Sequence, residues 1–365
     1  MIRFFVMIVS LVLSFPTSAL ADSLKIVSWN LANLAEGPNV PLRGQVRTEA
    51  DYAAIRRLIQ RLAPDVIALQ EIGSKKGPRL VLGDAYDIVF ESRCETNAKQ
   101  CEADVDDIFT AIAYRKRLAR AITPFQIESL AVLHQDCPTE PARQVRGGVG
   151  IKLKRGRKTY AIPSLHLKAS CKKNSAENDA DTQDDCATQA KQIDLLIAWM
   201  NAPEQRDNVL IMAGDFNREL VSRTDHVRAK LTKAISGLRF EPTGPRKCWT
   251  DGSLTDDAIR AIEAKAREKF PEIGQAGGHP VAYTPKGNQK IDYFVIRGLG
   301  RRTKLVAQQV LMGRAQHLDE VDDYLKTCPP EKPLKFPDNG VLVFSPAAPS
   351  DHCPIALTIT TSRRQ

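Results

Sequence analysis

The sequence has no Cys-x-x-Cys pair and no cysteine and histidine cluster at the spacing of zinc ligands, although it contains eight cysteines and six histidines. A structural zinc site is therefore not expected. Beyond the first 21 residues it has no apolar run long enough to cross a bilayer, and it has no internal repeat or low-complexity linker. These absences argue against a zinc-finger protein, a repeat protein and an integral membrane protein, and they leave a globular chain without a transmembrane segment.

The first 21 residues have the pattern of a secretory signal. Arg3 provides a positive charge, residues 4–15 form an almost unbroken apolar run, and residues 18–21 read Ser-Ala-Leu-Ala, with small residues where a signal peptidase needs them. The apolar run is shorter than the roughly 20 residues that a membrane anchor needs. We therefore expect a signal peptide over residues 1–21, cleavage after Ala21, and a mature protein that is secreted or periplasmic.

Charge and cysteine content also indicate partners and compartment. Lysine and arginine outnumber aspartate and glutamate by 52 to 43, which favours polyanionic partners such as nucleic acid or anionic lipid headgroups. The even number of cysteines indicates disulfide bonds in an exported chain. Cys94 and Cys101 are close enough in sequence to close one local loop, and Cys171 and Cys186 another. The pairing of the other four cysteines is left open.

Apolar patterns along the chain predict an α/β fold. Apolar residues recur at helical spacing between Ile55 and Leu62, and Thr48 and Pro64 provide a start and an end for this helix. The other predicted elements are strands over residues 25–30, 65–71, 109–114, 149–153, 159–167, 208–217, 291–297 and 354–360, and helices over 189–200 and 258–269. We expect a single domain over residues 22–365, with loop insertions near 172–185, 250–280 and 301–349.

Polar side chains that can carry chemistry stand at the ends of these predicted strands. They are Asn30, Glu71, His166, the pair Asp215 and Asn217, Asp292, and the pair Asp351 and His352. Side chains at strand ends can converge over one edge of a sheet while the strands hold them rigidly. Carboxylates and histidines beside a divalent cation suit the hydrolysis of phosphate esters, because the cation offsets the charge that repels a nucleophile.

The motifs around these residues resemble those of the endonuclease/exonuclease/phosphatase superfamily, which includes deoxyribonucleases, abasic-site endonucleases, neutral sphingomyelinases and inositol-polyphosphate phosphatases. They are Ser-Trp-Asn-Leu at 28–31, Leu-Gln-Glu at 69–71, Ser-Leu-His-Leu at 164–167, Gly-Asp-Phe-Asn at 214–217, Ile-Asp-Tyr at 291–293 and Ser-Asp-His-Cys-Pro at 350–354. All six occur in the family's order. The resemblance implies a four-layered α/β sandwich, in which two packed mixed β-sheets are flanked by helices.

The resemblance also implies a metal site. Glu71 would be the principal metal ligand with Asn30 beside it, and Asp351 would be a second carboxylate ligand. Oxygen ligands of this kind favour hard cations over soft ones. We therefore expect Mg²⁺ or Mn²⁺ as the cofactor, with Ca²⁺ as an auxiliary ion.

The remaining motif residues have implied catalytic roles. Asp215 would orient or activate the attacking water, and Asn217 would hold the water and the phosphate. His352, paired with Asp292, would contact the scissile phosphate. Whether Asp215 or His352 is the base is left open.

His166 narrows the resemblance to part of the superfamily. Its Ser-Leu-His-Leu context is similar to that of deoxyribonuclease-like and sphingomyelinase- or phosphatase-like members, whereas abasic-site endonucleases have a tyrosine in this region. The resemblance makes His166 the candidate general acid toward the leaving oxygen, with Asp107 as its candidate carboxylate partner. Arg146 and Lys168 are candidate substrate-binding cations.

A basic segment at a predicted hairpin tip has two interpretations. Lysine or arginine fills five of the seven positions 152–158. These cations can contact nucleic-acid phosphates, or they can form a solvated strand edge that resists aggregation. Since no aromatic residue except Tyr160 stands among them for base stacking, the second interpretation is favoured.

Three functions fit these observations. The favoured one is an exported endonuclease, a divalent-metal-dependent phosphodiesterase that hydrolyses DNA, or RNA, by in-line attack of an activated water. The second is a phosphatase or sphingomyelinase-like phospholipase acting on lipid or inositol phosphates, although the sequence has no aromatic hairpin for membrane insertion. The third is an inactive phosphate-binding module. We expect a monomer that takes nucleic acid as substrate and has no stable protein partner.

Overall fold

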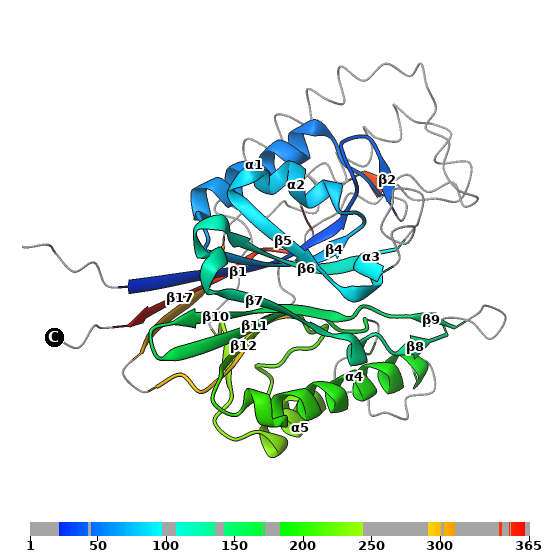
Figure 1. Cartoon of the computed structure of the whole chain (residues 1–365). Coiled ribbons are helices and arrows are strands. Elements are labelled where there is room, and N and C mark those ends of the chain that lie inside the picture. Colours follow the sequence, from blue (N-terminus) through cyan, green and yellow to red (C-terminus); the bar gives the residue numbers. More distant parts are fainter. Residues whose placement is uncertain are drawn as a thin grey trace, which may run out of the picture.

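The computed structural model describes residues 22–42, 45–96, 107–135, 142–169, 171, 183–243, 291–300, 303–310, 343–344, 350 and 352–361. In this part of the chain, two six-stranded β-sheets form the centre of the molecule (Figure 1). Each sheet is mixed, because each contains one parallel pair of strands among antiparallel neighbours.

The first sheet joins the two ends of the described chain. Its strand order is β15 (Lys304–Gln309), β17 (Ile355–Thr361), β1 (Asp22–Leu34), β4 (Val66–Ile72), β6 (Phe109–Arg115) and β5 (Tyr86–Phe90). β1 and β4 are parallel, and the other neighbours are antiparallel. β1 and β17 pair from Asp22 with Thr361 to Ser28 with Ile355, so the last described strand lies beside the first.

The second sheet is built from the middle of the chain. Its strand order is β13 (Arg239–Glu241), β14 (Asp292–Arg297), β12 (Val209–Asp215), β11 (Lys158–His166), β10 (Gly148–Arg155) and β7 (Ile122–Ile127). β11 and β12 are parallel, and the other neighbours are antiparallel. The parallel pair therefore lies in the interior of the sheet.

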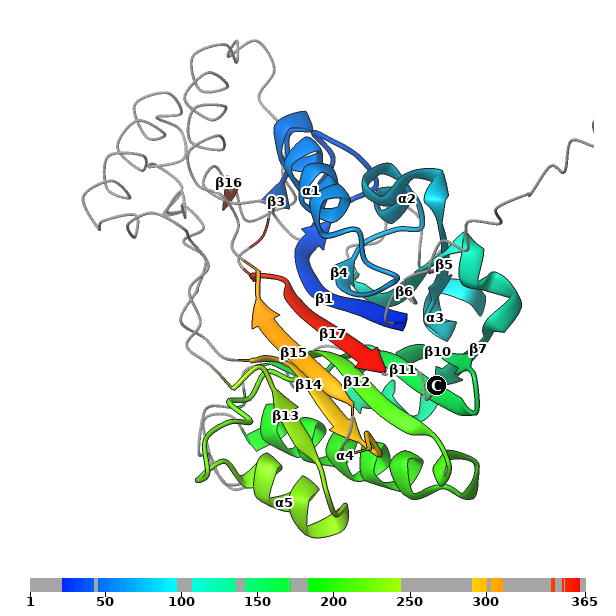
Figure 2. The same ribbon diagram turned by 90° about the vertical axis from the view of Figure 1, so that its left-hand side faces the viewer.

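The central strands are apolar on both faces because both faces are covered. In β4, Val66 and Ala68 face the second sheet, while Ile67 and Leu69 face the helices. Helices α1 (Glu49–Leu62) and α2 (Lys76–Leu82) cover the outer face of the first sheet, and α4 (Gln183–Asn201) and α5 (His226–Ala234) cover that of the second (Figures 1 and 2). The predicted four-layered α/β sandwich is confirmed.

Helix α1 begins and ends where the sequence predicts. The side chain of Thr48 accepts a hydrogen bond from the backbone N–H of Asp51, and the Asp51 carboxylate accepts one from the N–H of Thr48. This reciprocal pair satisfies two amides that the first turn of a helix leaves unpaired. At the other end Ala63 adopts a left-handed conformation, and Pro64 prevents continuation.

Short elements complete the described chain. They are the strands β2 (Pro41–Leu42), β3 (Gln45–Val46), β16 (Val343–Phe344), β8 (Leu133–His134) and β9 (Arg143–Gln144), helix α3 (Ser92–Thr96), and the 3₁₀ helices η1 (Gly83–Ala85), η3 (Lys116–Ala121), η4 (Glu128–Leu130) and η5 (Pro203–Gln205). None of the described helices is long and apolar enough to span a membrane.

The structure tests some of the remaining sequence predictions. The Cys171–Cys186 disulfide is present, with its Cα atoms 4.7 Å apart. Cys94 forms a disulfide, and Cys353 forms a disulfide as well. Cys101, the signal over residues 1–21, the helix over 258–269 and the insertion near 250–280 lie outside the described residues. The stretch 301–349, expected to be a loop insertion, contributes β15 to the first sheet and β16 to a small sheet with β3.

Candidate active site

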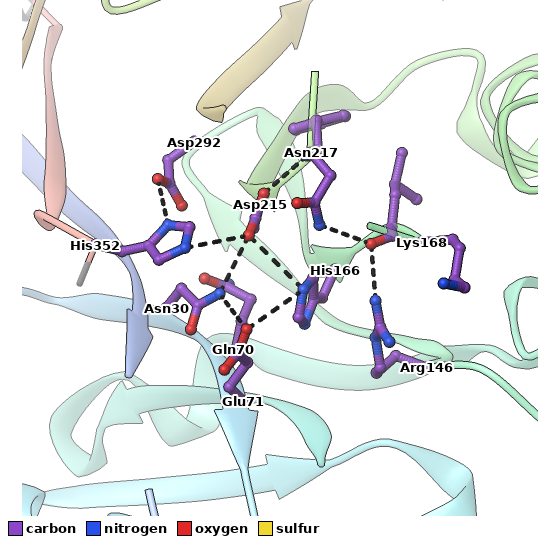
Figure 3. A network of polar contacts seen from close by, with 12 residues as sticks. Asn30, Gln70, Glu71, Arg146, His166, Lys168, Asp215, Asn217, Asp292 and His352 are labelled. Atoms are coloured by element: carbon purple, nitrogen blue, oxygen red, sulfur yellow. Dashed lines mark hydrogen bonds and ion pairs between the residues drawn. The ribbon is translucent and has the colours of Figure 1, made fainter. Parts of the chain in front are cut away.

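Six of the sequence-predicted residues meet at one edge of the sandwich (Figure 3). They are Asn30 of β1, Glu71 of β4, His166 of β11, Asp215 of β12, Asp292 of β14, and His352, three residues before β17. The two parallel pairs of strands end at this edge, and β14 and β17 begin there because they run antiparallel to β12 and β1. The strand directions alone thus bring together residues from both sheets.

One imidazole is oriented by a carboxylate. Asp292 opens β14 directly opposite Asp215, and its Oδ2 lies 2.8 Å from Nδ1 of His352. This contact holds the imidazole plane and directs Nε2 of His352 toward Asp215, whose Oδ2 lies 3.7 Å away. The other oxygen of Asp292, Oδ1, is buried and accepts no hydrogen bond from the described residues.

The backbone at His352 is fixed to the first strand. The Ser350 hydroxyl donates to the carbonyl of Asn30 at 2.6 Å and accepts the N–H of His352 at 3.1 Å. The indole N–H of Trp29 donates to the carbonyl of His352 at 2.8 Å. Trp29 therefore belongs to the wall of the site, and Ser350 is a positioning residue for the imidazole.

Asn30 holds two carboxylates close together. Its amide nitrogen donates to Glu71 Oε1 at 2.9 Å and to Asp215 Oδ2 at 3.1 Å. Its amide oxygen accepts the N–H of Ala32 at 2.9 Å, which sets the orientation of the amide. In this arrangement the amide nitrogen, and not the oxygen, faces the two carboxylates.

A second imidazole approaches the same carboxylates from β11. His166 is 4% exposed, and its Nε2 lies 3.8 Å from Glu71 Oε1 and 3.7 Å from Asp215 Oδ2. His166 pairs with Asp215 in the parallel register of β11 and β12. The two imidazoles therefore flank one carboxylate oxygen at equal distances.

The turn after β12 is tight and carries Asn217. Gly214 precedes this turn, and a Cβ there would lie 1.9 Å from the carbonyl oxygen of Leu165, so only glycine fits. Asn217 has a left-handed backbone, with φ of 51°, and its N–H donates to Asp215 Oδ1 at 2.8 Å. Its amide nitrogen and the guanidinium of Arg146 both donate to the carbonyl of Leu167, at 2.9 and 2.8 Å. Arg146 thus lies beside Asn217 at the rim of the site.

Glu71 is aimed by an irregular backbone. Its φ is 56°, and the pairing of β4 with both neighbours shifts register around it. A non-glycine residue in this region is held there by its surroundings at a cost of about 1–3 kcal/mol, and such residues cluster at functional sites. The N–H of Asn33 donates to Glu71 Oε2 at 3.2 Å.

Arg47 supports this irregular backbone and was not singled out by the sequence. Ala32 and Asn33 are both left-handed, with φ of 45° and 59°. The Arg47 side chain is buried, and its Nη2 donates to the carbonyls of Leu31 and Ala32 at 2.6 and 2.7 Å. Arg47 thereby holds the bulge that carries the N–H bonded to Glu71. Only the fold shows this role, since Arg47 lies outside all six motifs.

A buried polar bridge joins the two sheets beneath the site. The amide nitrogen of Gln70 donates to the Ser164 hydroxyl at 3.0 Å and lies 3.4 Å from that of Ser28. The Ser164 hydroxyl donates to the carbonyl of Leu69 at 3.0 Å. Ser28, Gln70 and Ser164 belong to the six motifs. The sequence did not predict that they bond to one another, because they lie on different strands.

Two further predicted residues make other contacts. Asp107 was expected beside His166, but its carboxylate accepts from Arg93 at 2.8 Å and from the backbone N–H of Ile108 at 2.7 Å. The ammonium of Lys168 lies 2.5 Å from Asp185 Oδ1, and Figure 3 shows its side chain pointing away from Asp215. Both residues are therefore engaged in ion pairs outside the cluster. Asp351 lies outside the described residues.

Burial dominates the protonation of Asp215. Loss of solvation raises the pKa of Asp215 from 3.8 to about 7, and the nearby His352 partly opposes the shift. The carboxylates of Asp292 and Glu71 raise this pKa further, whereas the hydrogen bond from the N–H of Asn217 lowers it. A carboxyl group with a pKa near neutrality can exchange protons in either direction.

The site has the donors of a divalent-cation site. Ligand atoms of Asp215, Asp292 and His352 lie within 4.8 Å of one another. Among the described residues, no lysine or arginine makes an ion pair with Glu71, Asp215 or Asp292. Three carboxylates in a largely buried site require positive charge, and the unpaired Oδ1 of Asp292 has the chemistry of a metal ligand.

This fold and this site define a hydrolytic phosphoesterase: carboxylates suited to a divalent cation stand beside two imidazoles at the edge of a four-layered sandwich. Residues 27–352 match the Endonuclease/Exonuclease/phosphatase family, and the chain belongs to that family. Members of the family generally use divalent metals.

Several solved structures are similar to this chain. They include D. rerio TDP2 complexed with single-strand DNA product (17% identity, TM-score 0.47, 93% of this chain and 99% of that chain covered), the human nocturnin catalytic domain with bound sulfate (14%, 0.47, 93% and 95%), and a mannosyl-6-phosphatase from Bacteroides thetaiotaomicron (14%, 0.47, 93% and 100%). No curated protein sequence matches the chain. At these identities the similar structures say nothing about the substrate of this one.

Proposed function

We propose that the protein is an exported, divalent-metal-dependent phosphodiesterase that cleaves DNA or RNA as an endonuclease. The observation that carries the proposal is the pair of imidazoles around Asp215, since Nε2 of His166 and Nε2 of His352 each lie 3.7 Å from its Oδ2. Hydrolysis of a phosphodiester needs a base for water and an acid for a poor alkoxide leaving group. The net charge of +9 and the secretory pattern of residues 1–21 support a polyanionic substrate outside the cell.

The residues of the site divide the chemistry as follows. Glu71, next to Asn30, would hold the cation, with Asp351 as a further ligand; once bound, the cation offsets the negative charge of the phosphate. Asp215 orients the attacking water and accepts its proton. Asn217 holds Asp215 in place through its N–H.

The two histidines act on the phosphate. His352, held by Asp292 through Nδ1, donates from Nε2 to a phosphoryl oxygen. His166, on the other side of Asp215, gives a proton to the leaving oxygen. Arg146, at the rim beside Asn217, attracts a neighbouring phosphate.

A substrate panel with and without metal tests this function. With Mg²⁺ or Mn²⁺ the full-length protein should nick supercoiled plasmid DNA, and EDTA should reduce the rate by at least about 10³-fold, because the clustered carboxylates then repel the phosphate. The same panel includes RNA, sphingomyelin vesicles and inositol phosphates. Turnover of a lipid or inositol phosphate with no cleavage of DNA or RNA would assign the second function considered from the sequence. Cleavage of DNA in excess EDTA would contradict the metal dependence.

Arg47 offers a test of the metal site from outside it. In Arg47→Met the carbonyls of Leu31 and Ala32 lose their donor, the bulge relaxes, and Glu71 loses its orientation. We expect the Mn²⁺ concentration for half-maximal activity to rise about 10–100-fold, the usual effect of losing a group that orients a metal ligand.

The matched control for Arg47→Met is Arg56→Met. Arg56 makes an exposed ion pair with Glu49 on helix α1, and its loss should leave the Mn²⁺ requirement unchanged. Circular dichroism establishes that both variants are folded. A folded Arg47→Met protein with the wild-type Mn²⁺ requirement would show that Arg47 does not position Glu71.

A further inference from the structure

Seven cations gather at the end of the sandwich opposite the active site. They are Lys116, Arg117 and Arg120 of η3 and Lys154, Arg155, Arg157 and Lys158 of the β10–β11 hairpin, and they are called here the basic end patch. The pairing of Leu153 with Ile122 places the end of β10 beside the end of η3. Neither residues 115–123 nor residues 150–160 contain an aspartate or glutamate. The patch is therefore positive throughout its own segments.

Most of this charge faces solvent. Lys116, Arg117, Arg120, Lys154 and Arg157 are exposed, and the other two members are partly exposed. Arg117 makes an ion pair with Asp65, which lies outside the patch. Arg155 donates to the backbone carbonyl of Ser23 at 2.8 Å.

The hairpin tip extends beyond the strands that flank it. β10 pairs with β7 from Gly148 to Leu153, and β11 pairs with β12 from Tyr160 onward. Lys154, Arg155 and Lys158 lie past these segments and pair only within the hairpin. The interpretation favoured from the sequence, a solvated edge that resists aggregation, therefore stays a prediction for this tip, and it requires no ligand for the cations.

The patch is also distinct from the catalytic cluster. Lys158 is the first residue of β11 and His166 is the last. Eight residues of extended chain span about 26 Å, at about 3.3 Å per residue. A group bound at the patch consequently cannot contact the metal-site carboxylates.

We propose that the basic end patch is a docking surface for the phosphate backbone of double-stranded nucleic acid. The inference rests on the proposed nuclease function and extends it to substrate class. A duplex rises about 3.4 Å per base pair, so roughly eight base pairs cover the distance from the patch to the site. The patch raises the local concentration of long duplexes near the catalytic edge.

The composition of the patch fits a duplex better than the other polyanions. It contains cations without stacking aromatics, which suits a sequence-independent phosphate backbone rather than the splayed bases of a single strand. The exposed large apolar residues among those described are Leu80, Leu133 and Val306, and none belongs to the patch. A surface without apolar side chains has nothing to insert into a lipid bilayer.

Charge reversal tests the proposal by binding, apart from catalysis. In the full-length His352→Ala protein, kept in EDTA, the affinity for a 30-base-pair DNA duplex is measured by fluorescence anisotropy between 50 and 200 mM NaCl. Lys154→Glu with Arg157→Glu should weaken binding at least about tenfold and lower the slope of log K against log salt by about 2. The matched control is Lys191→Glu with Lys233→Glu, which makes the same charge change on exposed positions of α4 and α5 and should weaken binding less than about threefold.

Each outcome separates the docking surface from the catalytic proposal. In the active background the patch variant should hydrolyse a small aryl phosphodiester at the wild-type rate, which establishes that it is folded. Equal duplex affinity in the two charge-reversed variants overturns the proposal even if the protein cleaves DNA. Patch-dependent binding to vesicles of phosphatidylglycerol, with none to the duplex, overturns it in favour of a membrane surface. Patch-dependent duplex binding without DNA cleavage in any metal overturns the nuclease and leaves the docking surface standing.

Discussion

Asp215→Asn is expected to stop catalysis and, at the same time, to stabilise the metal-free protein at alkaline pH. The rate should fall on the order of 10³-fold, because an amide cannot take a proton from water. Stability should rise because burial holds the pKa of Asp215 near 7, against 3.8 in an exposed chain. Ionising this carboxyl therefore costs the folded protein free energy that an uncharged amide avoids.

The direction with pH follows from proton binding. Between about pH 4 and pH 7 the folded protein keeps a proton that the unfolded chain has released, so the free energy of unfolding falls as pH rises through this window. The difference between the two pKa values corresponds to about 4 kcal/mol, lost by about pH 8. The new amide nitrogen would face that of Asn30, which now donates to Asp215 at 3.1 Å, so we expect a net gain of about 2 kcal/mol.

Thermal unfolding in EDTA measures this effect. At pH 8 the midpoint of Asp215→Asn should lie roughly 2–5 °C above that of the wild type, and at pH 5, where the wild-type carboxyl is protonated, the gain should disappear. Asp194→Asn is the control, because the Asp194 side chain is 60% exposed and should show no such pH dependence. A lower midpoint for Asp215→Asn at both pH values would mean that the carboxylate is not destabilised by burial.

His166→Ala should lose activity in proportion to the need for a leaving-group proton. On DNA, where the leaving group is an alkoxide, the rate should fall about 10³-fold. On bis(p-nitrophenyl) phosphate, whose phenolate leaves without a proton, the loss should be below about tenfold. The reason is geometric, since His166 approaches Asp215 from the side opposite His352.

His352→Ala separates the two roles. His352 donates to a phosphoryl oxygen in the proposed mechanism, so both substrates should slow by a similar factor, about 10²–10³-fold. His226→Ala, at the exposed start of α5, should slow neither. If His166→Ala slowed DNA and the aryl diester equally, His166 would bind the substrate and would not serve as the acid.

Local patterns in the sequence predict the parts of the protein that depend on neighbouring residues. The spacing from Ile55 to Leu62 and the cap at Thr48 define α1 because a helix satisfies its own hydrogen bonds. The strand segments that lead to Asn30 and Asp215 are recognisable because they are buried on both faces and largely apolar. The layers of the fold follow from these elements.

Contacts between distant segments are what the sequence does not predict. Arg47 acts on the carbonyls of Leu31 and Ala32, and nothing in its own neighbourhood marks it. Asp107 has a suitable position for pairing with His166, but the guanidinium of Arg93 takes its carboxylate instead. β15 alternates partly buried and exposed residues and has only three consecutive apolar residues, so its pairing with β17 is what identifies it as a strand.

The position of β17 has a consequence for how the protein is made. β17 lies between β15 and β1, and the hydrogen bond from Trp29 to His352 joins residues 323 positions apart. The first sheet therefore cannot close until residue 361 has been synthesised, and such long-range closure is slow. Until residue 352 has been synthesised, the growing chain has His166 but lacks His352, the second histidine of the site. The candidate active site is therefore assembled only after β17 has been translated, although Asn30 and Glu71 are made more than 280 residues earlier.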